Sequence, residues 1–208
     1  MNIFWYGQTC FKIEFFSPGK EKINLVIDPY PDRFGLKLQN LTADILLLTK
    51  KDMTDKNKIS RNYFLIEGAG EYEIKSAFIR GISFLDDNTI YILKLEDITL
   101  CHLGYLKEGL KENELEEIGK VDILMIPVGG NIVLSPQKAS EILNQVEPSI
   151  VIPMMFSLPK LKLKLEGVEK FLKIFGIHRL EPLPKFSIRK KDIVEGEAKI
   201  ILLKSWKK

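Results

Sequence analysis

Charged and hydroxyl side chains crowd together directly after one short apolar run. The run is Ile45–Leu48, and the side chains that follow it are Lys50, Lys51, Asp52, Thr54 and Asp55. Four apolar residues are too few for a buried helix but suit a strand that is buried on both faces. Layered α/β proteins place their sites at the carboxyl ends of such strands. The two carboxylates could therefore hold a divalent metal, and a lysine could bind a small anion.

Other reactive patterns are weak. The sequence has only two histidines, His102 and His178, and neither lies next to a serine, threonine or cysteine in the manner of a nucleophile and its base. It has no glycine-rich phosphate loop. His178 stands beside Arg179 and Glu181 after a predicted helix end, which is typical of a surface histidine.

The composition is that of a soluble globular protein. The chain has 208 residues, of which 45% are hydrophobic and 28% charged, and a net charge of +3. We expect one domain over residues 1–208 with a substantial core. No stretch approaches a membrane span, and no signal peptide is present at the start. Cys10 and Cys101 lie far apart in apolar runs, so we expect buried thiols and a cytoplasmic location.

Short apolar runs bounded by turn residues predict many strands. They are expected at residues 3–6, 11–15, 23–27, 45–48, 63–66, 78–84, 89–95, 98–102, 121–127, 149–152, 186–188 and 199–203. Helices are expected at 113–118, from a cap at Ser135 to a stop at Pro148, and from Val168 to a stop at Gly176. Lysine and leucine alternate over residues 160–165, which predicts a basic edge strand or an extended loop with one apolar side.

Several segments resemble the metallo-β-lactamase superfamily, and the resemblance covers nearly the whole chain. Gly7-Gln8-Thr9-Cys10-Phe11 resembles its Gly-His-Ser-Cys-Phe, and Ile27-Asp28-Pro29-Tyr30 its Ile-Asp-Pro-Phe/Tyr. The segment 68–74 is similar to Gly-Pro-Gly-Glu-Tyr-Glu-Ile/Val, and 126–130 also matches the lactonase-like branch of bacterial and archaeal Zn-dependent hydrolases. The resemblance implies an αβ/βα sandwich in four layers, with two mixed sheets face to face and helices outside.

The metal ligands that this family would supply are replaced. In its Thr/Ser-His-x-His-x-Asp-His signature, Thr49 matches, but the histidines fall on Lys50, Asp52 and Asp55 and the aspartate on Thr54. A bridging aspartate after His102 becomes Tyr105, and a last histidine becomes Met155. A protonated lysine cannot bind zinc, and threonine and methionine are poor zinc ligands. We therefore expect a metal-free, non-catalytic relative with a structural or binding role, in which Lys50 or Lys51 pairs with Asp52 or Asp55.

Two other functions stay open. Asp52, Asp55 and His102, together with Glu71, could form a carboxylate-rich site for Mn, Mg, Fe or Zn and support hydrolysis. Alternatively, residues 185–208 hold eight lysines and arginines against three acidic residues, which is a basic surface for nucleic acid, although a solvated tail explains it as well. A small anionic ligand, and a homodimer through the leucines of 160–165, are further expectations.

Overall fold

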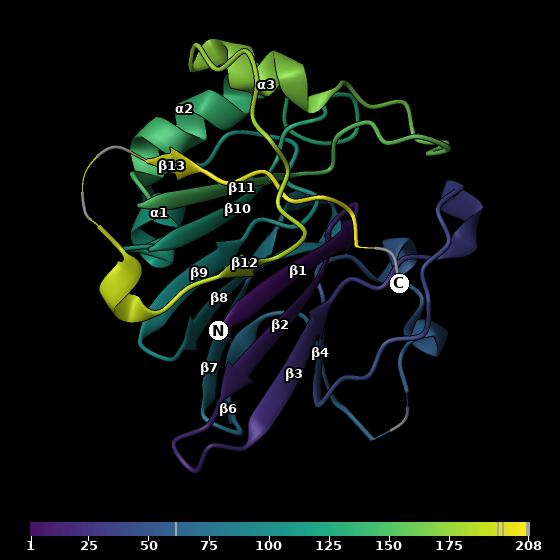
Figure 1. The fold of residues 1–208 in the computed structure, drawn as a ribbon, viewed down its shortest axis with the longest axis vertical. Coiled ribbons are helices and arrows are strands. Elements are labelled where there is room, and N and C mark those ends of the chain that lie inside the picture. The colour runs from purple at the N-terminus through teal and green to yellow at the C-terminus, as the bar shows by residue number, and fades with distance from the viewer. Residues whose placement is uncertain (61, 195, 197, 207–208) are drawn as a thin grey trace.

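Two β-sheets carry the fold in the computed structural model (Figure 1), which describes residues 1–60, 62–194, 196 and 198–206. The six-stranded sheet A has the order β12-β1-β2-β3-β4-β5, and the seven-stranded sheet C the order β13-β11-β10-β9-β8-β7-β6. The strands of sheet A are β1 (Asn2–Gly7), β2 (Cys10–Phe16), β3 (Lys22–Ile27), β4 (Ile45–Leu48), β5 (Phe64–Glu67) and β12 (Phe186–Ser187). Those of sheet C are β6 (Gly70–Ile74), β7 (Ala77–Phe84), β8 (Asn88–Leu95), β9 (Ile98–His102), β10 (Ile123–Pro127), β11 (Ile150–Met154) and β13 (Lys199–Ile200).

Both sheets are mixed, and the reason lies in the connections between strands. Strands β1, β2 and β3 are joined by short turns and pair antiparallel, whereas β3, β4 and β5 pair parallel. Sheet C likewise begins with an antiparallel meander and ends with the parallel strands β9, β10, β11 and β13. Parallel pairing needs crossover connections, which here carry the helices. The main core lies between the two sheets, and the mixed-sheet sandwich predicted from the sequence is confirmed.

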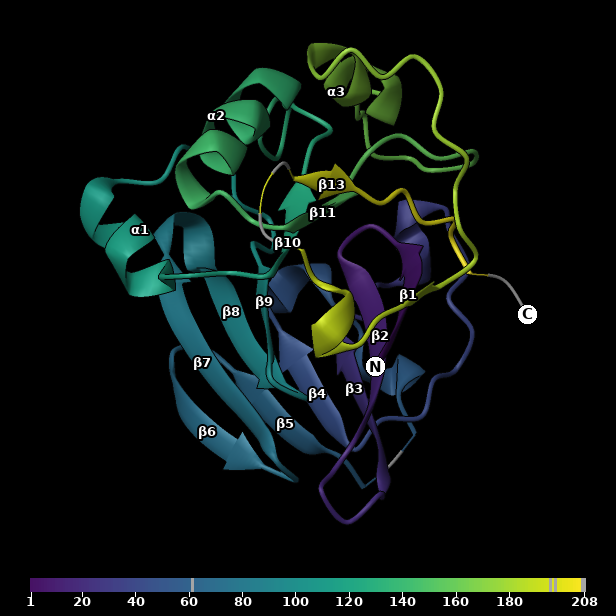
Figure 2. The same cartoon turned by 60° about the vertical axis from the view of Figure 1, so that its left-hand side comes forward.

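The two outer faces are covered differently. Helices α1 (Glu112–Ile118), α2 (Pro136–Val146) and α3 (Val168–Ile174) lie on the side of sheet C (Figure 2). The Ser135 side chain caps α2 by accepting a hydrogen bond from the Lys138 amide, and Gly176 follows α3, as predicted. The outer face of sheet A is covered by loops and the short 3-10 helices η1 (Asp32–Phe34), η2 (Lys51–Met53) and η3 (Lys56–Lys58). No helix among the described residues is long and apolar enough to cross a membrane.

One strand was not predicted from the sequence: residues 70–74 form the edge strand β6. Residues 160–165 form a loop and no strand, which is the second of the two predicted forms. Its leucines turn toward the body of the chain, and the Lys162 amide donates to the Phe34 carbonyl.

Candidate functional site

Parallel strands β3 and β4 end side by side, and this places Asp28 against Thr49. Asp28 is fully buried and accepts hydrogen bonds from the Thr49 amide (2.7 Å) and the Thr49 hydroxyl (2.5 Å). Burial raises the pKa of Asp28 to about 7, although the hydrogen bonds from Thr49 act in the opposite direction. Asp28 thus joins the end of β3 to the start of the charged loop.

The end of β9 places His102 in the core between the sheets. Its Nε2 lies 3.1 Å from the carbonyl oxygen of Thr9, and its Nδ1 accepts a hydrogen bond from the Gly104 amide at 3.2 Å. Since Nδ1 is an acceptor, the ring proton sits on Nε2 and is donated to Thr9. Burial lowers the pKa of His102 to about 4, so the ring is neutral near pH 7. Both ring nitrogens are engaged by the backbone, which leaves neither free to bind a metal.

Two of the positions where the resemblance expects metal ligands meet in a small apolar cluster. Tyr105 and Met155 are buried and pack with Val133, while Met53, Leu163 and Leu165 close around them; we call these six residues the Tyr105 cluster. Asn88 fixes the loop that carries Tyr105, because its Oδ1 accepts from the Tyr105 amide at 2.7 Å. Methionine, leucine and valine side chains therefore gather where the resemblance places metal ligands.

Polar atoms without partners lie beside this cluster. The buried side-chain atoms of the described residues that lack a hydrogen bond are Gln8 Oε1 and Nε2, Thr9 Oγ1 and the Tyr105 hydroxyl. Burial raises the pKa of both Asp28 and Tyr105, and the nearby Thr9 hydroxyl offsets only a small part of each rise, without the geometry of a hydrogen bond to either. Each unpaired group costs about 1–3 kcal/mol unless an ordered water satisfies it.

The charged residues after β4 point to the surface. Lys50 donates to the Asp86 carbonyl at 2.7 Å, and Lys51 pairs with Glu67 at 3.4 Å. Asp55 accepts from the Asn57 amide and caps η3. The expected pairing of these lysines with Asp52 or Asp55 is therefore wrong, because both ammonium groups reach across to neighbouring strands and turns.

The carboxylates and the histidine proposed for a second kind of metal site are not brought together. Asp52 is exposed, its carbonyl accepts from Arg33, and Thr54 donates to the Lys51 carbonyl within the same exposed loop. Glu71 lies exposed on β6 opposite Arg80, whereas His102 is fully buried. Nowhere in residues 1–60, 62–194, 196 and 198–206 do three or more His, Cys, Asp or Glu side chains gather in a group that could hold a metal. The residues present do not fit a zinc centre.

A cavity of about 560 Å³ opens beside Thr49, next to the charged loop. Its charged lining residues are Lys51, Asp52, Glu67 and Asp87, and the Lys51 ammonium is already paired with Glu67. Three carboxylates against one ammonium make these walls unfavourable for the small anion expected from the sequence.

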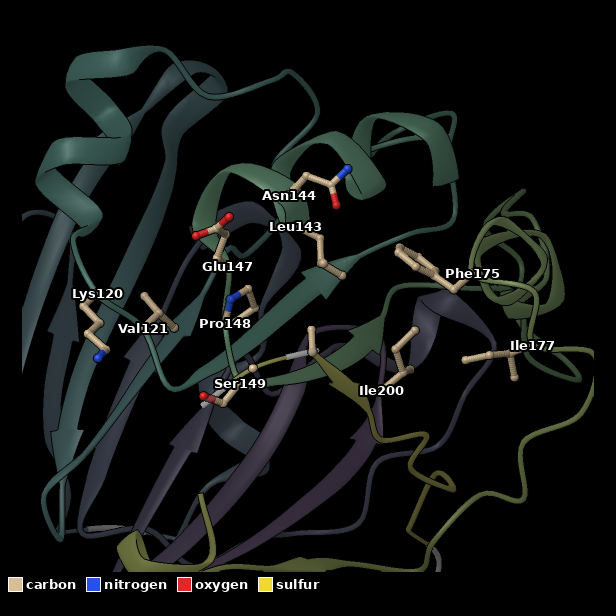
Figure 3. Close-up of a pocket in the computed structure, with 12 residues that line it drawn as sticks. Lys120, Val121, Leu143, Asn144, Glu147, Pro148, Ser149, Phe175, Ile177 and Ile200 are labelled. Carbon is tan, nitrogen blue, oxygen red and sulfur yellow. The ribbon is translucent and has the colours of Figure 1, made fainter. Parts of the chain in front are cut away.

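A larger cavity of about 900 Å³ lies at the opposite ends of the strands, where β10, β11 and β13 begin (Figure 3). Leu143, Phe175 and Ile200 form much of its wall, and none of the site residues predicted from the sequence lines it.

Met53 and Asp28 are the two residues that the sequence reasoning undervalued. Met53 occupies a variable position of the family signature, between Asp52 and Thr54, yet its side chain packs against the Tyr105 cluster. The available signal was an apolar residue inside a charged run. Asp28 entered the sequence analysis only as part of the segment Ile27-Asp28-Pro29-Tyr30, but an acid that directly follows a buried strand is the pattern of a buried hydrogen-bond acceptor.

Comparisons with known proteins agree with the fold. Residues 2–155 match the family described as the beta-lactamase superfamily domain. A UPF0173 protein of Pyrococcus abyssi is 27% identical over 186 residues, covering 75% of this chain and 83% of its own. A UPF0173 metal-dependent hydrolase of Koribacter versatilis is 30% identical over 94 residues, covering 44% of this chain and 40% of its own.

A solved structure is similar over almost the full length. It is a protein of Thermotoga maritima described as a candidate Zn-dependent hydrolase of the metallo-beta-lactamase superfamily, with a TM-score of 0.80, 28% identity and 98% of each chain covered. A metallo hydrolase of Ignicoccus hospitalis shares the fold, with a TM-score of 0.64 and 15% identity over 90% of this chain and 99% of its own. With a family match over most of its residues and a fold shared with these structures, the chain belongs to the metallo-β-lactamase superfamily.

Proposed function

We propose that this chain is a metal-free, non-hydrolytic member of its hydrolase family and that it acts as a binding or structural protein, folded as one domain over residues 1–208. The observation that carries the proposal is the Tyr105 cluster. Tyr105 and Met155 stand at two positions where the resemblance expects metal ligands, and both are buried against Val133 and Met53.

The chemistry of the donor atoms supports the same proposal. Metal-assisted hydrolysis needs several imidazole or carboxylate ligands at about 2 Å and an open position for water. Here the Lys50 ammonium would repel a cation, and the Thr54 hydroxyl donates a hydrogen bond to the Lys51 carbonyl of its own loop. The two ring nitrogens of His102 are engaged by the Thr9 carbonyl and the Gly104 amide. Several relatives are named metal-dependent hydrolases, and the proposal sets this chain apart from the activity in those names.

Elemental analysis of the purified protein for Zn, Mn and Fe, without chelator, tests the proposal. We expect far less than one equivalent of any of them. Addition of each metal should also leave the melting temperature unchanged, because a ligand that binds only the native state must raise it. Ester, lactone and phosphodiester substrates should show no metal-dependent hydrolysis.

The Asp52→Ala variant separates the metal-free proposal from a hydrolase with a carboxylate-rich metal site. It removes an exposed carboxylate, so metal content and stability should equal those of the unchanged protein. One equivalent of a transition metal in the unchanged protein, lost in Asp52→Ala, would overturn the proposal in favour of a site built on Asp52, Asp55 and His102.

A further inference from the structure

A cavity of about 590 Å³ lies outside sheet A and combines aromatic walls with basic rims. Tyr6, Tyr30 and Trp206 contribute the rings, and Lys37 and Lys160 contribute the ammonium groups. Its volume falls within the usual range for small-molecule sites, about 300–1,000 Å³.

The aromatic walls are held in place by contacts from within the chain. The Tyr30 hydroxyl donates to the Tyr6 carbonyl at 2.8 Å, and the Ser205 hydroxyl donates to the same carbonyl at 3.1 Å. The Trp206 ring packs edge-on against Phe4, with 5.1 Å between ring centroids, while its side chain stays partly exposed. Burial raises the pKa of Tyr6 to about 12, so its hydroxyl remains a hydrogen-bond donor at every ordinary pH.

The segment that follows Lys160 packs its apolar side against the body of the chain. Leu161 and Leu163 pack inward beside Phe34, and the Lys162 amide donates to the Phe34 carbonyl at 2.8 Å. Lys160, in a turn with a positive φ of 72°, and the following Lys162 and Lys164 are all exposed. No carboxylate of the described residues lies within ion-pair distance of Lys37 or of these three lysines, so their charge is available to an anion from outside.

A second hollow continues the first one. It is about 410 Å³ in volume, and its described lining includes Ser205 and Trp206, which also line the first cavity, together with Lys204 and Pro184. Trp206 therefore borders both hollows, and each of them has at least one lysine.

From this arrangement we propose that the Trp206 cavity binds a nucleotide unit, with its base against Trp206 and its phosphate on Lys37 and Lys160. Aromatic rings stack on any base, and lysines attract the phosphate, which is the combination found in single-strand binding surfaces. A free mononucleotide and one unit of a single-stranded nucleic acid share this chemistry. The site shares Ser205 and Trp206 with the basic C-terminal stretch 185–208 but takes its lysines, Lys37 and Lys160, from outside it. Within that stretch Arg189 pairs with Asp192 and Lys190 with Asp122. Lys207 and Lys208 lie outside the described residues.

Fluorescence anisotropy with a short labelled oligothymidylate, together with competition by AMP and by inorganic phosphate, tests the proposal on the full chain. Trp206→Leu should weaken binding by roughly five- to 150-fold, which corresponds to the stacking of one base. Lys37→Gln with Lys160→Gln removes two phosphate contacts. The slope of log affinity against log salt should then become shallower by about 1.4.

Matched controls come from the outer face of sheet C. Phe78→Ala removes an exposed aromatic ring, and Lys94→Gln removes an exposed ammonium group. The two residues are register partners on β7 and β8 of the other sheet, so both variants should leave binding unchanged. The double lysine variant keeps every buried contact, so a loss of binding in it cannot come from unfolding.

The outcomes discriminate clearly. Competition by AMP supports a mononucleotide site, and binding of the oligonucleotide alone supports a single-strand site. Absent binding, binding that the Trp206 and lysine variants leave unchanged, or equal losses in the control variants would overturn the proposal. Competition by inorganic phosphate as strong as that by AMP would show an anion site in which the ring plays no part, and would overturn it as well.

Discussion

Asp28 and His102 are fully buried titratable side chains whose pKa values move in opposite directions. Burial raises that of Asp28 from 3.8 to about 7 and lowers that of His102 from 6.5 to about 4. Asp28 alone would stabilise the fold at low pH and lose that contribution as pH rises from about 4 to 7. His102 alone would stabilise it above pH 6.5 and lose that contribution as pH falls to about 4.

The two effects oppose each other over the same range. Between about pH 4 and 6.5, the folded pair carries one proton, on Asp28, and the unfolded pair also carries one, on His102. Because the proton count is equal in the two states, the pair adds almost no pH dependence to the free energy of unfolding there.

Single substitutions should expose the two slopes. In Asp28→Asn, which keeps an acceptor for the Thr49 amide, stability should rise with pH from about 4 to 6.5 relative to the unchanged protein. In His102→Gln it should fall as pH rises from about 4 to 7, each by at most about 1.4 kcal/mol per pH unit. Urea unfolding at a series of pH values measures both. Curves parallel to that of the unchanged protein would show that neither side chain titrates as described.

At the scale of elements, the segment 157–166 covers the Tyr105 cluster and is tied down at both ends. The Ser157 amide donates to the Glu166 carbonyl at 2.8 Å, and the Glu166 amide donates to the Gly129 carbonyl at 2.7 Å. The alternation of lysine and leucine correctly predicted one apolar side. It could not predict what that side contacts, because the partners Met53, Tyr105 and Met155 are distant in sequence. Likewise, β6 was missed because an exposed edge strand with two exposed glutamates lacks an apolar run.

Gly129 permits the close approach of this segment. A Cβ there would overlap the Met155 carbonyl and press on Leu165 at 3.0 Å. Gly129→Ala should therefore destabilise the protein by about 2 kcal/mol or more, through overpacking. Gly109→Ala is the matched control, since its Cβ would meet nothing within 4 Å and its stability should stay within about 0.5 kcal/mol. Equal urea midpoints for the two variants would mean that the covering segment moves aside without cost.

For the whole molecule, the family resemblance predicted the sandwich of two sheets. The side-chain contacts between the sheets could not be predicted, because the hydrophobic pattern of the sequence does not show which residues of one sheet meet which residues of the other. Phe11 of β2 and His102 of β9 are one such pair, with ring centroids 5.7 Å apart in an edge-on arrangement. The resemblance also places Tyr105, Met155 and Asp52 at positions where the family has metal ligands, and burial separates them: Tyr105 and Met155 are enclosed, whereas Asp52 stays in solvent.

Phe11→Ala tests whether the sheets unfold as one unit, as the proposed single domain requires. The fully buried ring should cost about 3–5 kcal/mol, and near- and far-ultraviolet circular dichroism should still report one shared transition. Phe78→Ala, at 45% exposure, should cost far less. Two separated transitions in Phe11→Ala would contradict a single cooperative domain.

The enclosed Tyr105 cluster limits how this chain could gain metal ligands one substitution at a time. Tyr105→Asp by itself would bury a second carboxyl group near Asp28 and leave it without a counter-charge. Met155→His by itself would place an imidazole among leucine, valine and methionine side chains. Each substitution lowers stability before a second one can complete a metal site, so stepwise evolution toward a metal centre passes through less stable proteins.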